Sequence, residues 1–174
     1  AAAAPRREPR AFSYLKPRLV TAEPPAIDVI GRAVLAARCN DYVPALVRAL
    51  VDHTIALQNR RGLESGNSQP IQLSVLNRRR RAARAWLQSI LSGAVDQPTL
   101  HAVATQWLPT LCGHSSDPEV LARTTRSCVE FLRGAFVGVL FDEPAENLLG
   151  HARALNVLET VLSVHLAAAQ EALR

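Results

Sequence analysis

The residues best suited to chemistry in this chain are arginines, which gather in two short stretches of its first half. A guanidinium group presents a planar fork of donors that matches phosphate oxygens two at a time. A bound polyanion also releases counterions, which supplies much of the affinity of nucleic-acid-binding proteins. Seven arginines are therefore the candidate nucleic-acid contacts: Arg60, Arg61, Arg78, Arg79, Arg80, Arg81 and Arg84.

A run of arginines also has simpler interpretations. It can be a solvated helix surface, or it can pair with acidic residues of the same chain or of a partner protein. Trp86 follows the cluster, and we expect it to pack in the core rather than to stack on bases. The sequence leaves nucleic-acid binding and these alternatives open.

The charge is divided unevenly along the chain. Residues 1–88 contain 15 basic and six acidic residues, a net charge of +9, whereas residues 89–174 contain five basic and nine acidic residues, a net charge of −4. Opposite charges on two halves favour head-to-tail contacts between copies, which build rings or filaments. We therefore predict a self-associating, coat-like protein that packages nucleic acid, with the phosphate backbone and further copies of the chain as partners.

The histidines and cysteines form no recognisable metal or catalytic motif. His151 and His165 lie on the apolar face of one predicted helix, but 14 residues separate them by about 21 Å, too far to share a metal ion. Cys39, Cys112 and Cys128 include no Cys-x-x-Cys pair, so we predict buried thiols in a reducing compartment. No phosphate-binding loop or catalytic triad is evident either, so we predict no cofactor, no metal and no enzymatic activity.

The composition indicates one globular domain. The chain has 174 residues, of which 48% are hydrophobic and 20% charged, proportions that suit a folded core. No apolar run approaches the roughly 20 residues that cross a bilayer. We therefore expect no membrane association and a cytoplasmic or virion-associated location.

Helical periodicity predicts the elements that position the arginines. From Ser74 to Gly93, apolar residues recur three and four positions apart, so one helix carries the charged block in its first half. Gly134 and Gly138, one turn apart, are expected to let another helix approach closely. The predicted fold is an all-α domain of about six helices, in a bundle or a globin-like packing. The predicted helices span about 25–40, 40–62, 74–93, 96–111, 116–140 and 147–173.

Two regions follow from the placement of proline. Residues 1–25 contain five of the eleven prolines and are predicted to form an extended basic arm, because proline disfavours helix at and before its position. Residues 26–174 form the helical domain. Two other functions remain compatible with this organisation. One is a globin-like sensor or dimerisation domain in which His151 or His165 meets a ligand, and the other is a structural subunit of a larger complex.

Overall fold

The computed structural model describes residues 25–66, 69–142 and 148–174, and every regular element within these ranges is helical. The predicted all-α class is confirmed, whereas the N-terminal arm lies outside the described residues. Five α-helices of 11 residues or more form the framework of the described part. The elements are α3 (Val29–Cys39), η1 (Asn40–Tyr42), α4 (Val43–Ser65), α5 (Leu73–Leu91), α6 (Gln97–Ala102), η2 (Val103–Trp107), α7 (Leu108–Cys112), α8 (Pro118–Leu140) and α9 (Leu148–Ala172).

The prediction of about six helices is corrected to five, because the segment expected as one helix from 96 to 111 is interrupted. Asp96 caps its start, where the helix was predicted to begin, and accepts a hydrogen bond from the Thr99 amide at 3.3 Å. The helix then widens into the π-helical turn η2, in which the Leu108 amide bonds to the Val103 carbonyl five residues earlier. Pro109, which lacks a backbone donor, follows directly. Short pieces α6 and α7 therefore flank the turn.

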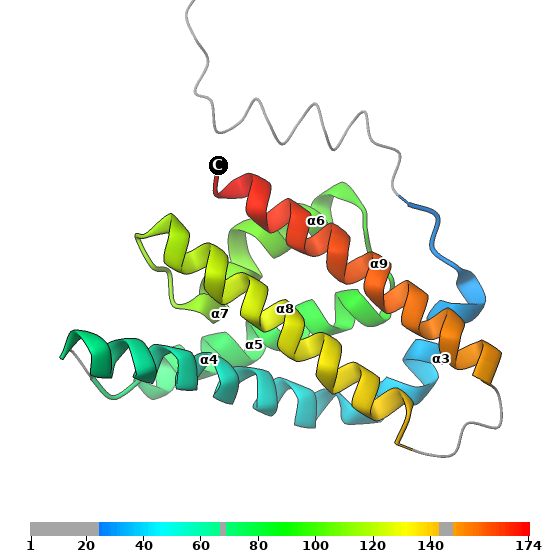
Figure 1. Ribbon diagram of the computed structural model, residues 1–174, viewed down its shortest axis with the longest axis horizontal. Coiled ribbons are helices and arrows are strands. Elements are labelled where there is room, and N and C mark those ends of the chain that lie inside the picture. The colour runs from blue at the N-terminus through cyan, green and yellow to red at the C-terminus, as the bar shows by residue number, and fades with distance from the viewer. Residues whose placement is uncertain (1–24, 67–68, 143–147) are drawn as a thin grey trace, which may run out of the picture.

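The long helices pack around one core. Figure 1 shows α8 and α9 running antiparallel across the front, with α4 below α8 and α5 behind them. Trp86 of α5, Phe136 of α8 and Leu158 of α9 are fully buried where these helices meet. The expectation that Trp86 packs in the core is thereby confirmed.

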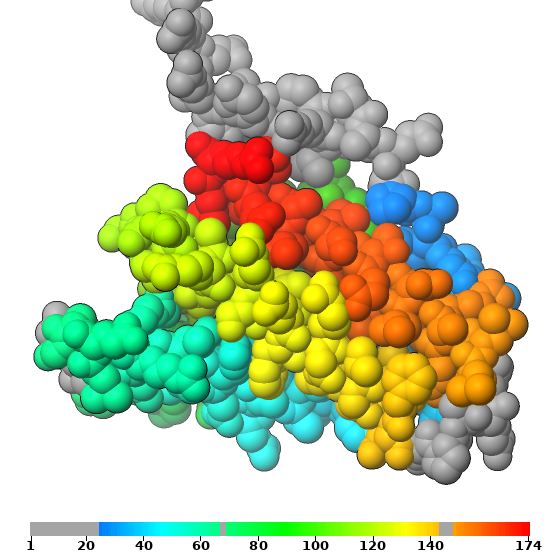
Figure 2. Space-filling view, in the orientation of Figure 1, coloured from blue at the N-terminus to red at the C-terminus, as the bar shows by residue number. Residues whose placement is uncertain are grey.

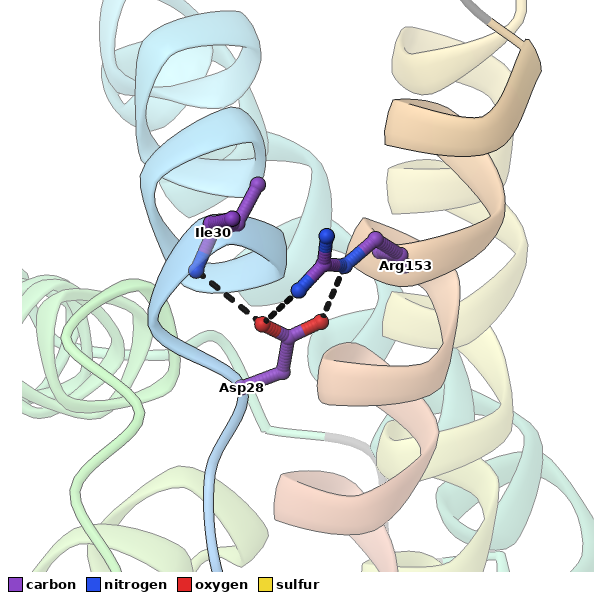
Figure 3. Close-up of polar contacts among 3 residues, drawn as sticks. All are labelled: Asp28, Ile30 and Arg153. Atoms are coloured by element: carbon purple, nitrogen blue, oxygen red, sulfur yellow. Dashed lines mark hydrogen bonds and ion pairs between the residues drawn. The ribbon is translucent and has the colours of Figure 1, made fainter.

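Helix α3 packs against α9, and the contact includes an ion pair and a close approach of the two backbones. The Asp28 carboxylate caps α3 through the Ile30 amide at 3.1 Å and accepts two hydrogen bonds from Arg153, at 2.6 and 2.7 Å (Figure 3). These bonds lower the pKa of Asp28 to about 2. A Cβ atom on Gly31 would lie 2.5 Å from the Arg153 carbonyl oxygen, so only glycine permits this spacing.

The glycines expected to admit a neighbouring helix are not the ones that do. A Cβ atom on Gly134 or Gly138 would meet no neighbouring atom within 4 Å, so the expectation for this pair is wrong, and Gly31 makes the close contact instead. Helix α4 also runs through Gly62, where we expected it to end, and stops at Gly66, whose φ of 70° is left-handed. The cap of α8 is Asp117, one residue after the predicted start of this helix at 116.

No helix in the ranges that the structure describes combines the length and the apolar character needed to cross a membrane.

Candidate nucleic-acid interface

The outer face of α5 presents four exposed arginines. At about 100° per residue, these side chains fall within about 160° of the helix circumference, opposite the apolar face that holds Trp86. Within the described ranges, none of them lies within ion-pair distance of a carboxylate, and the Arg80 guanidinium donates to the Asn77 side chain at 3.4 Å. Their positive charges are therefore available to an external anion. We call this surface, formed by Arg78, Arg80, Arg81 and Arg84, the outer face of α5.

Arg79 points the opposite way, into the contact between α5 and α4. It is only 2% exposed. Its guanidinium donates to Thr54 Oγ1 at 3.3 Å and to Gln58 Oε1, both on α4. Its Nε has no partner, and burial lowers its pKa. A phosphate outside the protein cannot reach this side chain, so the structure separates Arg79 from its exposed neighbours.

Two buried cysteines lie near the Arg79 charge. A hydrogen bond with Cys128 lowers the pKa of Cys112, and contacts with Thr125 and the charges of Arg61 and Arg79 act in the same direction. The same hydrogen bond and burial raise the pKa of Cys128. All three cysteines are buried and free, which confirms the prediction of buried thiols.

The two remaining predicted arginines, Arg60 and Arg61, lie on another side of the molecule, in a recess between α4 and α8. The recess has a volume of about 600 Å³. In Figure 2 it lies where the teal surface of α4 and the yellow-green surface of α8 diverge. Its wall on α8 contributes Arg123, which sequence reasoning missed because that arginine stands apart from the others in sequence. The lining consists of Leu57, Arg60, Arg61, Glu64, Ser65, Val120, Arg123, Thr124 and Ser127.

The two histidines of α9 are both buried, and the contacts of His165 define its role. The Trp86 indole donates to His165 Nδ1 at 3.1 Å, and His165 Nε2 donates to the Ala94 carbonyl at 2.8 Å. Both ring nitrogens are thus engaged, which leaves none to ligate a haem or metal. His151 is buried with its ring centroid 5.8 Å from that of Phe141. No group of three potential metal-ligating side chains occurs among the residues described.

Comparison of the chain with known protein families, with curated proteins and with solved structures yields no match in any of the three. Functional inference therefore rests on the geometry of the arginines. That geometry divides the seven predicted contacts into the outer face of α5, the interior, and the recess between α4 and α8.

Proposed function

We propose that the chain is a non-enzymatic, self-associating helical protein that binds the phosphate backbone of nucleic acid through the outer face of α5. The observation that carries the proposal is the exposure of four guanidinium groups on one helix face, with no described carboxylate to neutralise them. Such a surface binds phosphates by charge-assisted hydrogen bonds and by release of counterions. Arg79 is left out of the contact set because it is buried.

Self-association is supported by charge and by exposed apolar side chains. The +9 and −4 halves of the sequence favour contacts between copies. Leu148 and Leu149, at the start of α9, are each 70% exposed, and Phe141, just beyond the end of α8, is 45% exposed. Exposed apolar surface of this kind favours protein contacts. A coat-like assembly in the cytoplasm or in a virion combines both properties.

The test compares two double variants that each remove two exposed arginines. Arg80→Ala/Arg84→Ala removes charge from the outer face of α5, and Arg48→Ala/Arg126→Ala removes the same charge elsewhere. Binding of a labelled duplex is measured by fluorescence anisotropy across a series of salt concentrations. We expect the first variant to reduce the salt slope by about 1.8, since each phosphate contact on a duplex contributes about 0.9.

The control variant is expected to keep the slope of the unmodified protein. Equal affinities and slopes for the two variants would contradict the proposal. Light scattering during size-exclusion chromatography tests self-association on the same samples, and a monomer at all concentrations would remove that part. The ratio of absorbance at 260 and 280 nm reports nucleic acid that copurifies.

A further inference from the structure

The recess between α4 and α8 brings cationic side chains together from two walls. Arg60 and Arg61 come from the last two turns of α4, and Arg123 comes from the second turn of α8. The two helices run antiparallel (Figure 1), and residues more than 60 positions apart in sequence line the same space. The recess is therefore a product of the fold rather than of a local run of charge.

The charge of the recess is not balanced from within. Among the described residues, Arg60 and Arg123 make no side-chain hydrogen bond or ion pair, and the Arg61 Nε reaches only the Leu57 carbonyl, at 3.4 Å. Glu64 is the one carboxylate in the lining. Three guanidiniums and one carboxylate leave a charge of +2. The Asp117 side chain already accepts from the Glu119 amide at 2.9 Å, so the positive charge comes from the arginines rather than from the start of α8.

A fourth guanidinium, that of Arg79, is electrostatically coupled to Arg61 of the recess. Burial is the main cause of the lowered pKa of Arg79, and the like charge of Arg61 acts in the same direction. Arg79 is buried, its Nε lacks a partner, and its hydrogen bonds go to the neutral side chains of Thr54 and Gln58. An anion held by Arg61 relieves this repulsion and so stabilises the buried charge as well.

We propose that this recess binds a small phosphorylated organic molecule, at a site separate from the outer face of α5. A phosphate ester carries about two negative charges and three acceptor oxygens, which matches the +2 charge of the lining. The volume of about 600 Å³ lies within the range of about 300 to 1,000 Å³ that is usual for small-molecule sites. Leu57 and Val120 offer apolar contacts to the organic part, and Glu64 can accept a hydrogen bond from a hydroxyl or amino group.

Phenyl phosphate is a suitable probe, because it combines a phosphate ester with a compact apolar body. Its binding to the full chain is measured by isothermal titration calorimetry at constant ionic strength, with phenol as the neutral comparison. We expect phenyl phosphate to bind and phenol not to bind. In Arg60→Gln/Arg123→Gln we expect affinity to fall about tenfold or more, the usual scale for losing hydrogen bonds between charged groups.

The matched control is Arg48→Gln/Arg126→Gln, which removes one exposed arginine from each of the same two helices but outside the recess. We expect it to bind phenyl phosphate as the unmodified protein does. Equal weakening in both double variants would overturn the proposal, because the probe would then respond only to net charge. Binding of phenol as tight as that of phenyl phosphate would also overturn it.

Two further arms separate this proposal from nucleic-acid binding. The variant Arg80→Ala/Arg84→Ala is expected to retain phenyl phosphate affinity, even if it loses nucleic acid; loss of the probe would place the anion on α5 and refute the recess. A single-stranded oligonucleotide is expected not to displace the probe. Displacement in the Arg80→Ala/Arg84→Ala background would assign the recess to a nucleic-acid strand and refute a free small ligand.

Discussion

The two halves of α5 bury polar side chains in contrasting ways. In the C-terminal half, the Trp86 indole bonds to His165, whose other ring nitrogen bonds to the Ala94 carbonyl, so every polar atom of this buried pair has a partner. In the N-terminal half, Arg79 buries a positive charge with neutral partners and one unpaired nitrogen. All hydrogen bonds of the buried Trp86–His165 pair are therefore made within the chain, whereas the hydrogen bonding of Arg79 is incomplete.

This difference separates a structural role from a functional one. A buried neutral network with all its hydrogen bonds made stabilises a unique packing of helices. A buried charge without a carboxylate costs stability, because desolvation is not repaid. Sites where a chain departs from local stability are often sites of function. We therefore interpret the C-terminal half of α5, where Trp86 bonds to His165 of α9, as structural, and the N-terminal half, which holds Arg79, as the part involved in binding.

The largest expected change in stability comes from removing the hydrogen bond between Trp86 and His165. His165→Phe leaves the buried Trp86 indole without a partner, whereas the part-exposed Ala94 carbonyl can bond to water instead. We expect the free energy of unfolding to fall by roughly 1 to 3 kcal/mol, the cost of one buried polar group left unpaired. Urea denaturation measures this change. A loss below about 0.5 kcal/mol, the range of ordinary surface substitutions, would contradict the role given to His165.

Replacing the buried Arg79 should change the free energy of unfolding in the opposite direction. Arg79→Met keeps an unbranched chain of similar length but removes the buried charge. Thr54 Oγ1 still donates to the Val51 carbonyl, at 2.8 Å, and Gln58 is part-exposed and can bond to water. We expect the unfolding free energy to rise by about 1 to 2 kcal/mol, as is common when a buried charge is replaced by an apolar side chain.

The same variant tests the proposed recess. Arg79→Met is expected to weaken phenyl phosphate binding while it stabilises the free protein, because the buried charge no longer favours an anion beside Arg61. Calorimetry and urea denaturation on one preparation provide both readings. Destabilisation together with unchanged affinity would show that Arg79 is a scaffold residue like His165, and the contrast between the two ends of α5 would not hold.

A smaller effect is expected from pH. Burial lowers the pKa of His165 below its ordinary value of 6.5, so the unfolded chain takes up the proton first as pH falls. The contribution of His165 to stability is therefore complete above pH 6.5 and is lost as pH decreases toward the folded pKa. Urea midpoints between pH 8 and pH 5 should decline more in the unmodified protein than in His165→Phe. Parallel declines would contradict the assignment, since His53, whose pKa burial also lowers, contributes equally to both proteins.

The smallest effect on stability is expected from the exposed neighbour of Arg79. Arg80→Met also replaces an arginine of α5 by methionine, but the side chain of Arg80 faces solvent. We expect its unfolding free energy to change by no more than about 0.5 kcal/mol, while the salt slope of duplex binding falls by about 0.9. A stability change as large as that of Arg79→Met would show that position within the run does not decide the role of an arginine.

Helical periodicity predicted most of the fold because the apolar residues of the long helices recur on one face. The predicted helix boundaries at 96 and 140 are confirmed by the Asp96 cap and by the end of α8 at Leu140. The π-helical turn was missed, because nothing in its composition distinguishes it from α-helix. The contact at Gly31 was missed as well, since a close approach depends on where α9 lies rather than on the residues around the glycine.

The candidate site was predictable in position along the chain but not in space. Consecutive arginines identify α5 as basic, and helix geometry alone places Arg79 opposite the centre of the other four. The apolar residues around Trp86 determine which side of α5 faces the core. The burial of Arg79 on that side could therefore have been predicted, but it was missed. The recess was not open to prediction, because Arg123 meets Arg60 only through the antiparallel packing of α4 and α8.

The π-helical turn between α6 and α7 determines how α7 is rotated about the helix axis relative to α6. A residue within such a turn is in effect an insertion, so deleting one from Val103–Trp107 would turn everything downstream by about 100° until the chain could compensate. Helix α7 follows the turn and ends at Cys112, and its cap is Gly113, on which a Cβ atom would lie 3.0 Å from the Arg79 guanidinium. The number of residues in this segment, more than their identity, is thus what keeps α7 aligned with the charged end of α5.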